Sequence, residues 1–151
     1  VATPPRRGYS VVTRRRPTAS ATRTFRGRAA ATRRFRRETA RARPRYRGEW
    51  GRYTRGCDVI IYVVDAHALD AIPLARKELH RLLEDRELAT TPVLVIANKI
   101  DLEPHISEPD LIRDLNLDYI TENPWIVIPI SALKVVNVDQ VLSWLIKQGG
   151  K

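Results

Sequence analysis

This sequence has few of the features that mark secreted, membrane-spanning or disulfide-stabilised proteins. It contains one cysteine, Cys57, so no internal disulfide framework can form and a reducing compartment is expected. No apolar stretch approaches the roughly 20 residues of a membrane-spanning helix. The early arginines are not followed by the apolar centre of a secretory signal. We therefore expect a soluble, cytoplasmic protein.

The N-terminal third contains no Leu, Ile, Lys, Asp, Asn or Gln. Residues 1–47 hold sixteen arginines and a single acid, Glu38, whereas residues 48–151 hold eleven basic residues against sixteen acids. The two parts therefore carry about +15 and about −5. Arginines at this density repel one another, and no apolar face recurs at a period of 2 or 3.6 to offset the repulsion. We predict that residues 1–44 are disordered and that residues 45–151 form a separate domain.

Three interpretations of residues 1–44 stay open. Residues with GC-rich codons dominate, so the segment resembles coding sequence translated out of frame. An Arg-, Ser- and Thr-rich stretch poor in acids also fits an organelle transit peptide, although it lacks leucines for an apolar face. The third interpretation is an RNA-binding arm, with arginines on phosphates and aromatic rings stacking on bases. Those aromatic residues are Tyr9, Phe25 and Phe35, together with Tyr46 just beyond the segment.

From Trp50 onward, two kinds of apolar pattern alternate. Continuous apolar runs predict buried strands at residues 58–65, 92–97 and 125–130. Apolar residues at three-to-four spacing predict helices at about residues 72–88, 108–115 and 138–147. This alternation predicts an α/β fold with a parallel sheet, in which ligands bind beyond the carboxyl ends of the strands.

Two polar motifs follow predicted strands. In Asn98-Lys99-Ile100-Asp101, the carboxylate suits guanine because it can accept from the ring N1–H and the exocyclic amine together. The Asn amide can serve guanine N7, and the Lys stem can lie along the base plane. Ser131-Ala132 follows the next strand, and small residues there let a backbone N–H approach a carbonyl oxygen such as guanine O6. Together the motifs predict a guanine-binding site.

These motifs are part of a longer resemblance to ADP-ribosylation-factor-like (Arf-like) small GTPases. It covers about residues 45–148 and is strongest to the branch that works on lysosomes. The resemblance implies a P-loop NTPase G domain that acts as a GTP-binding switch in vesicle or lysosome trafficking. The matching segments, in order, are Arg45-Tyr-Arg-Gly-Glu-Trp50-Gly-Arg-Tyr53-Thr-Arg-Gly56, Tyr62-Val-Val-Asp65-Ala, Glu78-Leu-His-Arg-Leu-Leu83, Pro92-Val-Leu-Val-Ile-Ala-Asn-Lys-Ile-Asp-Leu102 and Ser143-Trp-Leu-Ile146.

The resemblance assigns roles by position. Asn98, Lys99 and Asp101 resemble the family's base-binding motif, and Ala132 resembles its backbone contact to guanine. Leu133 stands where many relatives have Lys, which puts side-chain packing on the base in doubt there.

Two aromatic residues, Trp50 and Tyr53, resemble positions of the second switch. In the Arf group the Tyr helps to form the apolar surface that effectors contact. Ordinary core packing is the alternative for both side chains.

Other parts of a G domain are missing. The sequence contains neither G-x-x-x-x-G-K-[ST] nor the D-x-x-G-Q expected before Pro44. We therefore predict a truncated domain without the phosphate-loop strand and helix, with no catalytic residue and no metal ligand. In the family that strand lies beside residues 57–64, so we expect these residues to form an exposed sheet edge.

The resemblance implies GTP or GDP as the ligand, with Mg²⁺ in the complete family domain. It also implies effector proteins, an exchange factor, and peripheral association with endosome or lysosome membranes. Whether this chain hydrolyses GTP stays open. The alternative is a catalytically dead G-domain remnant that acts as a binding protein, with a basic arm for RNA or acidic partners.

For the remaining candidate residues we expect structural roles. Cys57 stands at the start of a predicted strand and has no evident His partner, so we expect a small buried residue and not a nucleophile. His67, His80 and His105 lack metal-ligand spacing and suit solvated or packed positions. Asp65, at the end of a strand, suggests a local pair or cap.

Overall fold

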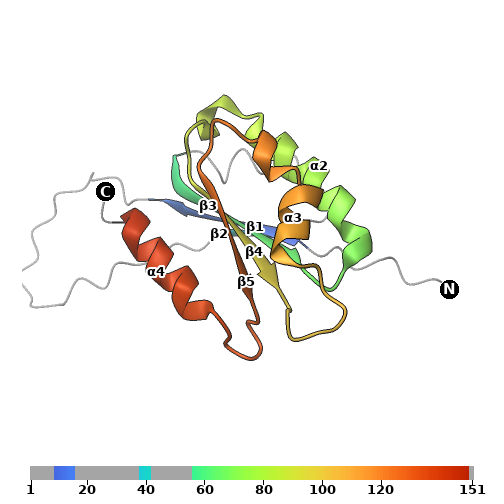
Figure 1. The fold of residues 1–151 in the computed structure, drawn as a ribbon. Helices are drawn as coiled ribbons and strands as arrows, with labels where there is room; N and C mark the ends of the chain where they lie inside the picture. Colours follow the sequence, from blue (N-terminus) through green and yellow to red (C-terminus); the bar gives the residue numbers. More distant parts are fainter. Residues whose placement is uncertain (1–8, 16–37, 42–55, 150–151) are drawn as a thin grey trace, which may run out of the picture.

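A five-stranded sheet forms the centre of the computed structural model, which describes residues 9–15, 38–41 and 56–149 (Figure 1). The strand order is β2-β1-β3-β4-β5. Strands β3, β4 and β5 are parallel to one another, as the sequence predicts. The bounds are β1 (Tyr9–Arg15), β2 (Glu38–Arg41), β3 (Cys57–Asp65), β4 (Val93–Asn98) and β5 (Trp125–Ile130).

Among the described residues, helices α2 and α3 and three short 3-10 segments connect the parallel strands, and helix α4 follows the last strand. The helices are α2 (Ile72–Leu83), α3 (Glu108–Asp114) and α4 (Val138–Gly149), and the 3-10 segments are η2 (Leu69–Ala71), η3 (Arg86–Leu88) and η4 (Leu117–Tyr119). Helix α2 ends five residues before the predicted boundary at residue 88, because Asp85 leaves the helical conformation and its side chain accepts the N–H of Glu87. Helix α3 begins where expected, and Ser107 caps it by accepting the N–H of Asp110.

The helices cover the two faces of the sheet unequally. Helices α2 and α3 lie on one side of it and α4 on the other (Figure 1). The larger core includes fully buried Tyr62 of β3 and Leu79 of α2, and the smaller one includes Leu94 of β4 and Val141 of α4. Burial on both faces explains why the parallel strands are nearly continuous apolar runs. Within the described ranges, no helix is long and apolar enough to cross a membrane.

Strands β1 and β2 arise in the segment for which the sequence predicts no regular element. Strand β1 pairs antiparallel with both β2 and β3. Such pairing is made by backbone groups, and β1 includes Tyr, Val and Thr, residue types enriched in strands. The sequence prediction therefore differs from the structure at these two stretches, and the rest of residues 1–44 lies outside the described residues.

The edge of β3 is consequently covered. The sequence predicts an exposed edge at residues 57–64, and this prediction is wrong, because β1 pairs with β3 from Tyr9 opposite Val64 to Arg15 opposite Cys57. No phosphate-loop motif follows β1 in the sequence. This pairing therefore satisfies the backbone of β3 without supplying a phosphate-binding loop.

Candidate functional site

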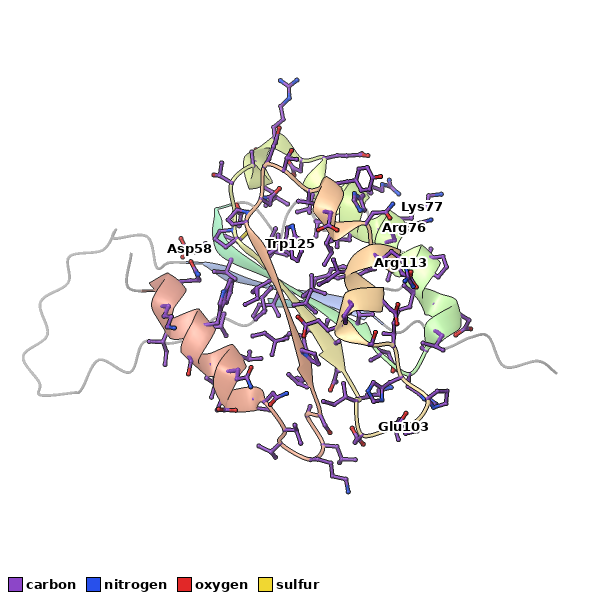
Figure 2. The ribbon with its side chains drawn as sticks, in the orientation of Figure 1. Asp58, Arg76, Lys77, Glu103, Arg113 and Trp125 are labelled. Atoms are coloured by element: carbon purple, nitrogen blue, oxygen red, sulfur yellow. The ribbon has the colours of Figure 1, made fainter. Side chains whose placement is uncertain are left out.

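The carboxyl ends of the three parallel strands lie at one level. The register pairs Asp65 with Asn98, and Asn98 with Ile130. The loops after β4 and β5 therefore start side by side. Figure 2 shows Glu103 on the loop after β4, at the end of the sheet away from Asp58 and Trp125 near the strand starts.

Asn98 joins the two loops. Its Oδ1 accepts the backbone N–H of Lys99 at 2.8 Å and that of Ala132, in the other loop, at 3.1 Å. A backbone bond from the N–H of Ile100 to the carbonyl of Ile130, 3.2 Å long, adds a second tie. The Asn side chain therefore acts as a bridge between the two predicted motifs.

Asp101 is the carboxylate that the sequence assigns to base recognition. Its Oδ1 accepts a hydrogen bond from Ser131 Oγ at 2.5 Å. This bond holds the pKa of Asp101 below its usual value, and the nearby positive charges of Lys134 and Lys99 lower the pKa further. Asp101 is therefore an anion at neutral pH, which is the form that can accept two N–H groups.

Ser131 organises the second loop. It is fully buried, and its Oγ also accepts the N–H of Lys134 at 3.0 Å. Its backbone pairs with Val136 in an isolated bridge, which closes a tight turn. That turn leaves Ala132 exposed, and 80% of Leu133 lies exposed as well.

Lys99 has an uncommon backbone conformation and a long-range partner. Its φ of 72° lies in the left-handed region, which disfavours residues with a side chain. Its ammonium forms an ion pair with Asp65 at the end of β3. The prediction that Asp65 pairs or caps locally is therefore incomplete: besides accepting the N–H of His67, it pairs across 34 residues of chain.

The structure thus brings five of the predicted site residues together, which are Asn98, Lys99, Asp101, Ser131 and Ala132. An anionic acceptor, an amide and a backbone donor stand on adjoining loops. These are groups that can distinguish the edge of one nucleobase from another. Trp50 and Tyr53, the predicted switch aromatics, lie outside the described residues.

The remaining candidates make local contacts or lie at the ends of elements. Cys57 is half-buried at the start of β3, so it is more exposed than the sequence predicts. The ring of His67 contacts the carbonyl of Pro104 at 2.8 Å, and that of His80 contacts the carbonyl of Leu115 at 2.8 Å. His105 lies near Leu102 and Glu103. Among the described residues, no group of three or more His, Cys, Asp or Glu is placed to hold a metal ion.

Two asparagines that the sequence analysis did not single out hold backbone turns: Asn137 lies beside the second loop, and Asn123 lies at the opposite end of the sheet. Asn123 is buried, and its Nδ2 donates to the carbonyls of Leu88 and Thr91. Asn137 donates to the carbonyl of Pro129 at 2.8 Å, next to the second loop. Asn123 bonds to backbone more than 30 residues away, and Asn137 bonds to backbone across a turn. Neither bond leaves a pattern of residue spacing in the sequence from which it could be predicted.

Comparison with known proteins identifies relatives of this chain. The profile of the ADP-ribosylation factor family matches residues 42–149. ADP-ribosylation factor-like protein 8c of Arabidopsis thaliana is 39% identical over 103 residues, which are 68% of this chain and 56% of the relative. The chain therefore spans little more than half the length of that relative.

A solved structure shares the fold. The Arl6 BBS3 small GTPase from Trypanosoma brucei, determined with the bound nucleotide analogue GppNp, matches with a TM-score of 0.66 at 23% identity. The match covers 71% of this chain and 67% of that chain. At this identity the likeness concerns the fold alone. On the family match and the relative together, this chain belongs to the ADP-ribosylation factor family of small GTPases.

Proposed function

We propose that this chain binds the guanine base of GTP or GDP at the loops after β4 and β5, as the base-recognising part of an Arf-like molecular switch. The observation that carries the proposal is the joining of these loops by two side-chain bonds. One bond runs from Ala132 N–H to Asn98 Oδ1, and the other from Ser131 Oγ to Asp101. Both bonds bring the predicted guanine contacts into one site.

Each group has a distinct role in the proposal. Asp101 accepts from guanine N1–H and the exocyclic amine, which adenine cannot offer together. The N–H of Ala132 donates to O6, sharing or replacing its bond to Asn98 Oδ1. The Asn98 amide serves N7, and the Lys99 stem lies along the ring. Ser131 keeps Asp101 ionised and oriented.

Family membership supports a wider role. The related structure from Trypanosoma brucei carries a guanine nucleotide analogue, and the 39% identical relative is an Arf-like protein. We extend the proposal to cycling between GDP and GTP, with an exchange factor and effector proteins as partners. The resemblance to the lysosomal branch supports a role in vesicle or lysosome trafficking, with peripheral association to those membranes.

The proposal for this chain covers recognition of the guanine base and not of the phosphates. The sequence contains no phosphate-loop motif and no D-x-x-G-Q, and it spans 56% of the related Arabidopsis protein. Mg²⁺ in this family is held with the phosphates, and the described residues offer no cluster that fits it. We therefore assign no step of GTP hydrolysis to any residue of this chain.

The test is a titration of the ¹⁵N-labelled full chain with GDP, ADP and xanthosine diphosphate. We expect GDP to shift the amides of the two loops at lower concentration than ADP does. Asp101→Asn should weaken GDP binding by roughly 10- to 100-fold, the effect of losing a charge-assisted pair. It should improve xanthosine diphosphate binding, because the Asn amide can donate to the xanthine 2-carbonyl.

Asp118→Asn is the matched control. Asp118 is exposed in η4, outside the two loops, and its replacement removes the same charge. GDP affinity should then be unchanged. Equal binding of GDP and ADP, or a base preference that Asp101→Asn leaves intact, would contradict the proposal.

The charge division of the chain supports a second function. Sixteen arginines against one acid in residues 1–47 suit binding to RNA or another polyanion. The measurement is RNA affinity of the full chain at several salt concentrations. Log affinity should fall linearly with log salt concentration. A full-length variant with Arg33, Arg34, Arg36 and Arg37 replaced by Gln should bind more weakly and with a shallower salt dependence. Salt-independent binding, or binding that this variant retains in full, excludes this role.

A further inference from the structure

Lys99 is held at both of its ends. Its backbone N–H donates to Asn98 Oδ1 at 2.8 Å, and its carbonyl accepts the N–H of Leu102 at 3.0 Å. Its ammonium pairs with the carboxylate of Asp65. The side chain therefore spans from the turn after β4 to the end of β3.

Asp65 is the more firmly placed member of the pair. It is the last residue of β3 and lies in register with Asn98. The next residue, Ala66, donates its N–H to the carbonyl of Asn98 at 2.8 Å, which fixes the backbone. The other oxygen of Asp65 accepts the N–H of His67 at 3.2 Å. The Asp65 side chain is 15% exposed and that of Lys99 50%, so the carboxylate positions the lysine rather than the reverse.

The ion pair matters because a lysine side chain without such a partner is flexible. Lysine has four carbons of stem and among the largest rotamer freedom of any side chain. Packing that stem along a ligand is costly when the stem must first be ordered, and costs less when it is ordered beforehand. The ion pair orders the Lys99 stem without any ligand.

We propose that Asp65 is a positioning residue for guanine: it anchors the Lys99 ammonium so that the stem forms a ready surface for the base plane. This inference rests on the proposed function, since it concerns the same site. Asp65 itself makes no contact with the base in this arrangement. It acts through Lys99, and it lies outside both sequence motifs.

A purely structural role makes different predictions. An ion pair with one half-exposed member contributes little to folding stability. Asp65→Asn keeps an oxygen for the N–H of His67 and removes only the charge that holds Lys99. If Asp65 positions the lysine, this variant changes GDP affinity while the urea midpoint of unfolding stays nearly constant.

The experiment compares four full-length proteins by GDP titration, followed through loop amide shifts. They are the wild type, Asp65→Asn, Lys99→Met and the double variant. Lys99→Met keeps an apolar stem and removes the ammonium. We expect Asp65→Asn to weaken GDP binding by roughly 3- to 10-fold, the scale of ordering one long side chain. In the Lys99→Met background, Asp65→Asn should have no further effect.

Two further readouts separate positioning from base-edge recognition. The Lys stem contacts the ring plane, so Asp65→Asn should weaken GDP and inosine diphosphate by the same factor, whereas Asp101→Asn should change their ratio. Asp70→Asn is the control for charge, because Asp70 is exposed in η2, only five residues from Asp65 in the chain. It should leave GDP affinity unchanged.

The outcomes distinguish failure of the positioning role of Asp65 from failure of the proposed guanine binding. If the wild type binds GDP and Asp101→Asn weakens it, but Asp65→Asn has no effect, the positioning role alone is overturned. Losses that add independently in the double variant also overturn it. If the wild type binds no guanine nucleotide, the proposed function fails and this inference fails with it.

Discussion

Ser131 Oγ donates a hydrogen bond to Asp101 Oδ1 at 2.5 Å, which links two loops that lie 30 residues apart in the chain. The donor is fully buried, whereas the acceptor is partly exposed beside Lys99. A buried hydroxyl that orients an exposed carboxylate makes that carboxylate both rigid and acidic. The properties of Asp101 therefore depend on a residue in the following strand-loop unit.

Replacing this hydroxyl should change the acid behaviour of Asp101. Ser131→Ala removes the main cause of its lowered pKa, so the pKa should rise toward the ordinary value of 3.8. Since the folded-state pKa lies below the unfolded one, the stabilisation by Asp101 is present above about pH 4 and is lost as the pH falls through the folded pKa. Ser131→Ala should therefore flatten the acid limb of stability below pH 4, measured by urea unfolding and by NMR titration of the carboxyl.

Ser107→Ala is the matched control for that experiment. Ser107 donates to Asp110 at 2.6 Å and lowers its pKa in the same way, together with Arg113, but it lies at the start of α3 outside the guanine-binding loops. It should raise the pKa of Asp110 and leave both Asp101 and GDP binding unchanged. An unchanged Asp101 pKa in Ser131→Ala would show that charges, not the hydroxyl, set its acidity.

The buried Asn123 should contribute strongly to stability. Its Nδ2 donates to the carbonyl of Leu88 at 2.7 Å and to that of Thr91 at 2.9 Å, which holds the turn before β4 against the segment that enters β5. Asn123→Ala removes both donors, so we expect the free energy of unfolding to fall by about 2 kcal/mol. Thr121→Ala, at an exposed position two residues earlier, should change it by less than about 0.5 kcal/mol. Equal effects of the two variants would contradict this role.

Helix α2 should depend on its buried face and not on its charges. Leu79 is fully buried in the larger core, so Leu79→Ala should reduce the free energy of unfolding by about 2–5 kcal/mol. Arg76 lies exposed on the same helix (Figure 2), and Arg76→Ala should change it by less than about 0.5 kcal/mol. Urea unfolding of both variants measures the difference. A small loss from Leu79→Ala would mean that the core relaxes around the cavity.

The sequence predicted the parts of this fold that a local pattern records. Three parallel strands and three helices lie within a few residues of their predicted bounds, because apolar runs and three-to-four spacing report burial directly. The proximity of the loop that starts at Asn98 to the loop that starts at Ser131 also followed from the sequence, whereas the individual bonds between them did not. Parallel strands place their carboxyl ends together, so motifs after neighbouring strands must lie close.

The features that the sequence analysis missed depend on partners far along the chain. The ion pair of Asp65 with Lys99 and the two bonds of Asn123 join residues more than 30 positions apart, and neither changes the apolar pattern. The pairing of β1 with β3 rests on backbone groups, which almost any residue can supply. The roles of Trp50 and Tyr53 stay predictions, because both lie outside the described residues.

The last prediction concerns that pairing. A fragment of residues 48–151 loses β1, so the backbone of β3 from Cys57 to Val64 becomes an open edge of apolar side chains. Such an edge is a template for pairing with another chain. We expect the fragment to be marginally stable or insoluble, measured by size-exclusion chromatography and urea unfolding at several protein concentrations. A chain that lacks only residues 1–8 retains β1 and should behave like the full chain. If the 48–151 fragment is instead a monomer that unfolds cooperatively, then β1 is dispensable, and the packing of α2, α3 and α4 on the parallel strands suffices to hold the sheet.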